Sequence, residues 1–333
     1  PERVNPDRFN YNQAIGQSAN EQMLLNLVRL RYRDVPVFLE VSSILSQYVF
    51  LGNINVSGSG GSGDALAGGG AGATYIDRPT ISYTPLTGEE FATQMLAPIP
   101  TEAIFSLAQS GWPAKELMLM SFDRLNHLEN TSFGRPLTED QIKSLEIFQH
   151  TIDLIVKLAK RHGLESQDDK DPETEERYLV FNPNPDHETQ LLINELKELL
   201  HLHPQHLSFR ITDRLIQREP DEITIRVRSL LTMMGFLSNG VEIPEDHREE
   251  AIVENDTEYG NLKKQDSLVP LKIHSSKEEP ENAFVAVEYQ DYWFYIEHSD
   301  HVSKQAFGLL TYLFILQAPQ PPATAPLLTV PTG

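Results

Sequence analysis

Residues 48–83 read YVFLGNINVSGSGGSGDALAGGGAGATYIDRPTISY, and this stretch decides how the first half of the chain is organised. Its two ends, Tyr48–Val56 and Ala73–Tyr83, are rich in β-branched and aromatic residues, which favour extended strands. The joint between them, residues 57–73, is almost entirely glycine, alanine and serine. No compact loop needs so many glycines, because each adds backbone entropy that folding removes. The stretch therefore predicts a β-hairpin arm over residues 47–83 with a flexible, glycine-rich tip.

Alternation along this arm separates an apolar side from a more polar one. An isolated hairpin is marginally stable in water, and its edges carry unpaired N–H and C=O groups that a neighbouring copy can satisfy. Three arrangements fit the pattern: a hairpin folded onto its own domain, a ring or chain of copies joined through the arm, and a hairpin associated with a membrane. Asp77 and Arg78 count against the last, since charges facing lipid are costly. The interaction residues expected on the arm are Tyr48, Phe50, Ile54, Val56, Tyr75, Ile81 and Tyr83.

Helix signals flank the arm on both sides. Ser18–Glu21 and Thr87–Glu90 each match a capping box, which predicts that a helix begins there. Further helices are expected after Pro100, from Pro113 to about Leu128, and over residues 138–163, where the closing glycine suits the C′ position. Together these segments predict a helical N-terminal domain that carries the arm.

Residues 164–177, LESQDDKDPETEER, form an acidic, non-periodic stretch that predicts a linker between two domains. The fold class is therefore α+β: a helical domain over 1–163 with the arm, then an α+β domain with an antiparallel sheet over 178–318. A Pro-rich tail covers 319–333. Strands in the second domain are expected at 178–181, 207–216, 223–227, 268–274, 284–289 and 292–296. Helices are expected at 186–202, 229–239 and 299–317, with an acidic surface excursion at 242–265.

Composition excludes several classes of protein. The 333 residues include 27 Lys and Arg against 48 Asp and Glu, a net charge of −21. A nucleic-acid-binding face needs clustered basic residues, so nucleic acid is not an expected partner. With 40% hydrophobic residues the chain can build packed cores, which excludes global disorder. The sequence has no cysteine, which excludes disulfides, Cys-ligated zinc, iron–sulfur clusters and thiol catalysis.

No motif indicates a cofactor or a metal. Gly58–Gly63 matches G-x-G-x-x-G, but a dinucleotide site needs a helix to begin at that loop, and the glycines that follow disfavour one. His201, His203 and His206 suit a helix C-terminus, whereas His298 and His301 flank Asp300 at a helix start, where Ser299 or Asp300 is a sufficient N-cap. Zinc normally needs three or four converging ligands, so no metal, cofactor or catalytic group is expected.

A second hairpin concentrates aromatic residues around a Gln290-Asp291 turn. Alternation places Trp293 and Tyr295 on one face of its second strand, and Tyr292 with Phe294 on the other. A strand with aromatic residues on both faces is central to two layers or half-exposed at an interface; a small-ligand platform is a third alternative. Tyr292, Trp293 and Tyr295 are therefore also candidate interaction residues.

Four stretches resemble an uncharacterised family of proteobacterial exported, lipoprotein-like envelope proteins. They are ANEQMLLNLVRLRYRDVPVFLEVSSI (19–44), RPTISYTPLTGEEF (78–91), PIPTEAIFSLAQSGWP (98–113) and VAVEYQDYWFYIEHSDHVSKQAFGLL (285–310). The resemblance covers most of the chain but carries no catalytic motif. It implies a location in the cell envelope, periplasm or outer membrane of a Gram-negative bacterium.

These observations favour a non-enzymatic, self-associating structural or assembly protein of the bacterial cell envelope. Its expected partners are further copies of itself or other envelope proteins, with peripheral or hairpin membrane association as a further possibility. The alternative is a periplasmic hydrolase or carbohydrate-binding protein with a site between the two domains, built from the aromatic hairpin and a carboxylate pair. The molar mass in solution discriminates between these hypotheses.

Overall fold

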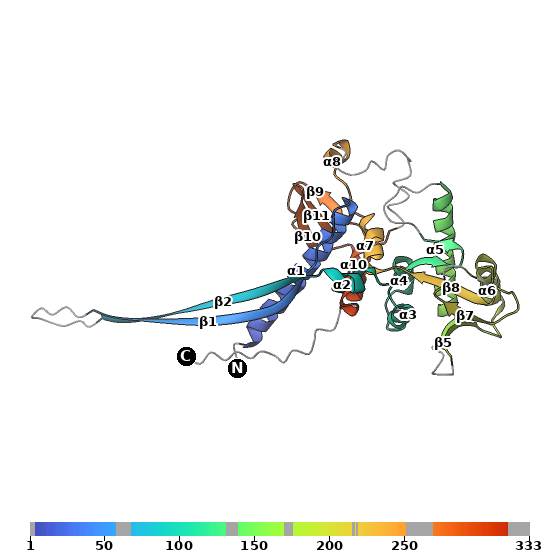
Figure 1. The fold of residues 1–333 in the computed structure, drawn as a ribbon, viewed down its shortest axis with the longest axis horizontal. Helices are drawn as coiled ribbons and strands as arrows, with labels where there is room; N and C mark the ends of the chain where they lie inside the picture. The colour runs from blue at the N-terminus through green and yellow to red at the C-terminus, as the bar shows by residue number, and fades with distance from the viewer. Residues whose placement is uncertain are drawn as a thin grey trace, which may run out of the picture. The chain divides into compact units, whose positions relative to one another are not determined.

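The computed structural model describes most of the chain, and most of its helices and strands are labelled in Figure 1. The described residues are 4–57, 68–130, 139–169, 176–214, 217, 219–250 and 269–318. They belong to two compact units, one formed by Val37–Thr87 and the other by Pro1–Pro36 together with Gly88–Gly333. Helices combine with a six-stranded mixed sheet, a three-stranded antiparallel sheet and a two-stranded hairpin, so the predicted α+β class is confirmed.

The smaller unit contains the glycine-rich hairpin, and its described residues form no other helix or strand. Strands β1 (Leu39–Ser57) and β2 (Gly68–Pro85) pair antiparallel along their whole length, with one register shift between Val41 and Ser43. Figure 1 shows the two strands running side by side as one continuous ribbon pair. The hairpin therefore exists where the sequence predicts it, and at its base it extends beyond the expected arm of residues 47–83.

Part of the expected glycine-rich loop is strand. We expected a loop over residues 57–73, but β2 begins at Gly68, and residues 68–72 pair with residues 53–57. Glycine weakens a strand without preventing it, because its backbone groups pair like those of other residues. The remainder of the loop, residues 58–67, lies outside the described residues, as does the match to the dinucleotide motif.

The larger unit begins with helix α1 (Val4–Arg31). The predicted start at Ser18–Glu21 is wrong, since this stretch lies inside the helix. Gln17 Nε2 donates a 2.9 Å hydrogen bond to Glu21 Oε1, a contact that side chains four positions apart make on a continuous helix. The apolar side chains near its end are fully buried, and α1 contacts strand β10 and helix α7. These buried residues are Met23, Leu24, Leu27 and Val28.

The helix predicted from Pro113 to Leu128 is shorter than expected. Helix α4 ends at Ser121, and the chain continues into two short strands that turn at Asn126. The side chain of Asn126 is buried, and its Oδ1 accepts a 2.8 Å hydrogen bond from the backbone N–H of Thr224. This long-range pairing overrides the helical spacing of the apolar residues. The elements of this region are α2 (Gly88–Phe91), the π-helical turn η1 (Ala92–Leu96), α3 (Thr101–Gln109), α4 (Ala114–Ser121), β3 (Phe122–Leu125) and β4 (Leu128–Glu129).

A six-stranded sheet in the order β4-β3-β8-β7-β6-β5 spans the expected domain boundary. Its other strands are β5 (Leu164–Asp168), β6 (Arg177–Phe181), β7 (Ser208–Thr212) and β8 (Glu222–Val227). Only β7 and β8 run parallel; the other neighbours are antiparallel. The expected linker at 164–177 begins with β5, which pairs with β6 along its whole length. The sheet takes strands from both sides of 164–177, so this stretch does not separate the two compact units.

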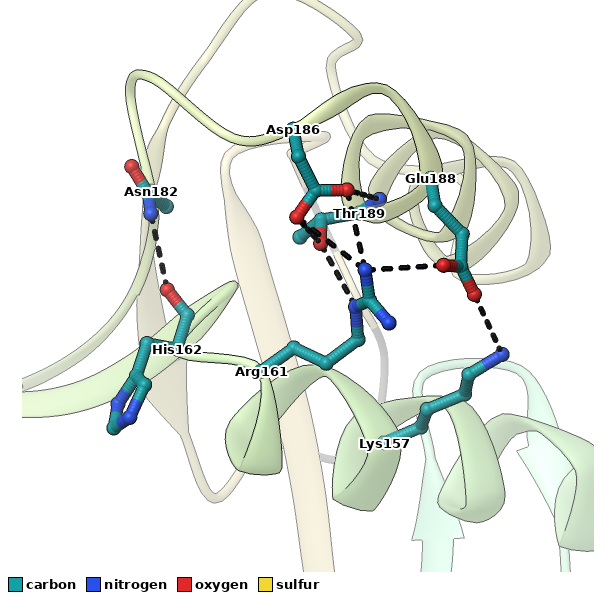
Figure 2. A network of polar contacts seen from close by, with 7 residues as sticks. All are labelled: Lys157, Arg161, His162, Asn182, Asp186, Glu188 and Thr189. Atoms are coloured by element: carbon teal, nitrogen blue, oxygen red, sulfur yellow. Dashed lines mark hydrogen bonds and ion pairs between the residues drawn. The ribbon is translucent and has the colours of Figure 1, made fainter.

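Arg161 joins the end of helix α5 (Glu139–Lys160) to the start of helix α6 (His187–Leu199), as Figure 2 shows. Its Nη2 lies 3.2 Å from Asp186 and 3.1 Å from Glu188, and its Nε donates to the Thr189 hydroxyl at 3.0 Å. Asp186 also caps α6 by accepting a 2.9 Å hydrogen bond from the backbone N–H of Thr189. This network fixes both helices beside the six-stranded sheet.

The glycine after α5 has a different role from the one the sequence predicts. His162, with φ of 54°, takes the left-handed position that we expected for Gly163. A Cβ at Gly163 would lie 2.7 Å from Thr189 Cγ2 and 2.8 Å from Leu158 Cδ2. Glycine is therefore present because the end of α5 approaches α6 closely.

We expect Asp186→Ala to lower the Tm at pH 7, because α6 loses its N-cap and Arg161 loses a partner. The Thr189 backbone N–H, the Thr189 hydroxyl and Arg161 lower the pKa of Asp186 to about 2. A carboxylate with a lowered pKa stabilises the fold above its unfolded pKa of about 3.9, and loses this effect as the pH falls through its folded pKa. The Tm difference between the wild type and the variant should therefore shrink between pH 5 and pH 2 in thermal melts.

Asp140→Ala is the matched control for this experiment. Asp140 lies in the first turn of α5, where its exposed carboxylate is 3.9 Å from Lys143. Exposed ion pairs contribute little, so this variant should melt close to the wild type at each pH. Equal losses in both variants, or a constant loss in Asp186→Ala down to pH 2, would contradict the prediction.

The C-terminal part contains α7 (Leu230–Ser238), α8 (Glu245–Glu249), β9 (His274–Ser276), β10 (Ala283–Tyr289), β11 (Tyr292–Glu297) and α10 (His301–Leu316). The three strands form an antiparallel sheet in the order β10-β11-β9. The predicted turn is confirmed, since Gln290 and Asp291 both have positive φ, as a two-residue hairpin turn requires. The strand expected at 268–274 begins only at His274. Residues 251–265 of the expected acidic excursion and the tail 319–333 lie outside the described residues.

Candidate functional site

The first candidate site is one side of the β1–β2 ladder. The register places Phe50 opposite Tyr75, and Ile54 opposite Ala71. Residues opposite each other share a side of an antiparallel pair, and residues two apart along a strand return to that side. By this rule all seven interaction residues predicted on the arm share one side. They are Tyr48, Phe50, Ile54, Val56, Tyr75, Ile81 and Tyr83.

The hairpin also differs from the rest of the chain in charge. Residues 37–87 contain only Glu40, Asp64, Asp77 and Arg78 as charged residues, whereas the whole chain has a net charge of −21. Copies of such a segment approach one another with little of the repulsion that the rest of the chain creates. Strand β1 contains no proline from Leu39 to Ser57, so every residue of its edge has an N–H group.

The second candidate site is strand β11. Phe294 and Ile296 are fully buried, which makes this face of the strand part of the core. Tyr292, Trp293 and Tyr295 are half-buried. Tyr295 packs against the ring of His274 on β9, with centroids 5.6 Å apart. Strand β11 is paired on both edges, with β10 and with β9, so these three residues belong to the central strand of this sheet in the larger unit.

A buried aromatic cluster lies beside β11, and no pattern in the sequence predicts it. The Tyr32 hydroxyl and His247 Nδ1 share a hydrogen bond of 2.6 Å, although 215 positions separate them. The Tyr32 ring packs edge-on against Tyr289 and Phe294. Burial raises the pKa of Tyr32, so the tyrosine is neutral at physiological pH. The cluster ties the end of α1 to α8 and to the β10–β11 hairpin.

An open depression with a volume of about 730 Å³ lies next to this cluster, and Tyr292 is the one residue of the aromatic strand prediction that lines it. The Tyr292 hydroxyl donates to Asp246 Oδ2 at 2.7 Å, and Lys277 Nζ donates to the same oxygen at 2.8 Å. Both contacts lower the pKa of the Asp246 carboxyl, which is therefore ionised at neutral pH. The side chains of Tyr292, Asp246 and Lys277 thus form hydrogen bonds with one another without a ligand.

The three histidines after α6 stack on other histidine rings, and one of them also lies beside an acid. His201 stacks on His127 with centroids 4.1 Å apart, and His203 stacks on His206. His206 Nδ1 lies 2.7 Å from Asp221. Of the two N-caps expected for α10, Asp300 is the one used, since its Oδ1 accepts a 3.0 Å hydrogen bond from the backbone N–H of Ser303. Across the described ranges, no group of three or more His, Cys, Asp or Glu side chains is arranged to hold a metal ion.

Comparison of the chain with protein-family models, with curated proteins and with solved structures finds no match. In the part of the chain that the structure describes, none of the helices combines the length and the apolar character needed to cross a bilayer. Functional inference therefore rests on the geometry of this chain itself.

Proposed function

We propose that this chain is a non-enzymatic assembly protein that joins further copies of itself through the β1–β2 hairpin. The observation that carries the proposal is the composition of the smaller unit: a ladder of 18 and 19 residues per strand with one predominantly apolar side and no other described element in the unit. At about 3.4 Å per residue the ladder is roughly 60 Å long. Strands in globular proteins are usually much shorter.

Physical chemistry supports a partner for such a ladder. A two-stranded sheet has no second layer of its own to bury an apolar side, and both of its edges carry N–H and C=O groups that point away from the partner strand. A second copy that continues the sheet satisfies these groups and joins the apolar sides into one larger surface. The low charge of residues 37–87 removes the main obstacle to this association.

The proposed location is the bacterial cell envelope, and its support is the resemblance of four stretches of the sequence to exported, lipoprotein-like proteins. Self-association or binding to other envelope proteins is consistent with that location. The alternative function, a carbohydrate-binding protein or hydrolase, would use the depression at Tyr292. The mutual pairing of Tyr292, Asp246 and Lys277 makes this alternative the weaker proposal.

Replacing the hairpin tests the proposal. Ser43 and Ser82 are opposite each other in the register, so an Asn-Gly turn in place of residues 44–81 keeps the base of the hairpin. We expect light scattering to give a larger mass for the wild type than the 37.7 kDa of one chain, and a monomer for the shortened protein. Circular dichroism confirms that the larger unit remains folded.

A pair of double variants separates the apolar side from the rest of the hairpin. Phe50→Lys with Ile54→Lys places two charges on the apolar side, whereas Asn53→Lys with Asn55→Lys places the same charges on the opposite side. The first pair should give monomers and the second should keep the mass of the wild type. A monomeric wild type, or a shortened protein with an unchanged oligomer mass, would refute the proposal. A monomer that binds a sugar saturably would favour the alternative.

A further inference from the structure

A notch in the six-stranded sheet gathers four arginines in a chain that is otherwise strongly acidic. The notch has a volume of about 680 Å³, within the usual range for small-molecule sites. It lies at the carboxyl end of β7, next to the start of β6 and the start of helix α3. The arginines that line it are Arg177, Arg210, Arg214 and Arg226.

The register of the sheet explains why this notch exists. The last pair between β7 and β8 is Thr212 with Thr224, whereas β8 continues to Val227. Residues 225–227 of β8 therefore have no partner residue on β7. Pro98 to Glu102, the segment that leads into α3, also line this space.

Carboxylates fix the arginines in place. Glu222 is buried, and its Oε2 lies 3.1 Å from Arg214 Nη1 and 3.7 Å from Arg210 Nη2. Arg226 is held by Nε, 3.1 Å from Asp123. A guanidinium has five N–H donors, and among the contacts of the described residues Arg214 uses only Nη1 for its ion pair and Arg226 only Nε. Arg214 and Arg226 are thus oriented while most of their donors have no partner among the contacts of the described residues, whereas Arg210 also pairs with Glu176.

Two further features of the notch suit an anion. Thr212 lines it, and its Oγ1 is buried without a hydrogen-bond partner among the described residues. The N-cap of the nine-residue helix α3 is Pro100, which makes no side-chain hydrogen bond to the first turn. The first N–H groups of a helix attract anions when no side chain caps them. Three acidic residues also line the notch: Glu102 and Asp213 have exposed side chains, and Glu176 Oε1 accepts a 3.1 Å hydrogen bond from Arg210 Nη1.

We infer that this notch binds a small anion that carries a phosphate group, with Arg214 and Arg226 as its principal ligands. Arginine forks match the oxygens of phosphate in a bidentate manner, and a hydroxyl and a helix N-terminus commonly complete such sites. The buried Glu222 pre-orients Arg210 and Arg214, so binding requires little ordering of these side chains. The site is separate from the hairpin and adds a ligand to the proposed assembly function.

Calorimetric titration of the full chain with inorganic pyrophosphate, in a buffer without phosphate, tests the inference. The wild type should bind saturably. Arg214→Gln and Arg226→Gln should each weaken the affinity by about tenfold, the typical effect of a lost hydrogen bond between charged groups. Arg226→Lys keeps the charge but loses the fork, so it should bind between the wild type and Arg226→Gln.

Arg248→Gln is the matched control, because it removes the same charge from an exposed arginine that lies outside the notch. Its affinity should equal that of the wild type. Thermal melts without ligand show whether each variant is folded, and Arg226→Lys is the variant least perturbing to the fold. Citrate, a carboxylate anion of similar size, should bind more weakly than pyrophosphate. Absence of saturation below about 1 mM, equal affinities in all variants, or tighter binding of citrate would overturn the inference.

Discussion

Gly240→Ala should destabilise the larger unit by more than about 3 kcal/mol, beyond the usual range for overpacked sites. A Cβ at Gly240 would lie 1.8 Å from the carbonyl oxygen of Leu271 and 2.9 Å from its carbonyl carbon. Backbone atoms cannot rotate away as the end of a side chain can. The backbone here is also fixed by hydrogen bonds, since Ile273 N–H donates to Gly240 O at 2.9 Å and Glu242 N–H donates to Ile273 O at 2.8 Å.

Gly308→Ala provides a control of opposite sign. Gly308 lies inside helix α10, and a Cβ there meets no atom within 4 Å. Alanine costs less than glycine inside a helix, so this variant should be more stable by about 0.5–1 kcal/mol. Chemical denaturation measures both changes. A Gly240→Ala protein as stable as the wild type would show that the segment 269–273 does not approach this position as closely as the structure indicates.

Features set by a few adjacent residues could be predicted from the sequence. The Gln290-Asp291 turn, an N-cap at Ser299 or Asp300 for the last helix and the strands of the glycine-rich hairpin all occur where the sequence places them. In each case the cause is local: left-handed backbone in a two-residue turn, a short acidic side chain at a helix start, or β-branched residues around a reversal. Local chemistry also fixed the α+β class.

Features set by pairing across the chain could not be predicted in this way. The stretch 122–129 has helical spacing of its apolar residues, but it pairs with β8 because Asn126 reverses the chain and binds the backbone at Thr224. The acidic stretch after Leu164 looks like a linker, but its first part, Leu164–Asp168, is the edge strand of a sheet, where polar side chains are tolerated. Composition alone does not distinguish an exposed edge strand from a linker.

The same reason limits the prediction of sites. Alternation alone identified the apolar side of the hairpin, because one register fixes both strands. The arginines of the notch are separated by up to 49 positions in the sequence, from Arg177 to Arg226, and no motif joins them. Tyr32 and His247 are separated by 215 positions. Only the tertiary structure brings these residues together, so sites of this kind can be identified only once the topology is known.

Arg228→Leu should destabilise the larger unit by about 3–5 kcal/mol, the usual cost of removing one partner from a buried charged network. The Arg228 side chain is 1% exposed. Its Nη1 donates to the carbonyl oxygens of Leu119 at 3.1 Å and Met120 at 2.9 Å, and its guanidinium lies 4.3 Å from the centroid of the Phe236 ring. Burial lowers its pKa to about 10, which still leaves it protonated at neutral pH.

Leucine at position 228 fills much of the volume but offers no donor, so the two carbonyl groups at the end of α4 stay buried without this partner. Arg226→Leu is the matched control: it removes an arginine two positions earlier on the same strand, whose side chain is 51% exposed and pairs with the partly exposed Asp123, which also lies 3.8 Å from Arg228 Nε. Such pairs contribute at most about 1 kcal/mol. Urea denaturation should therefore show a large loss for the first variant and a small one for the second. Similar losses of stability in both variants would mean that burial does not determine the contribution of Arg228. The packing of the end of α4 against the end of β8 would then depend on other contacts.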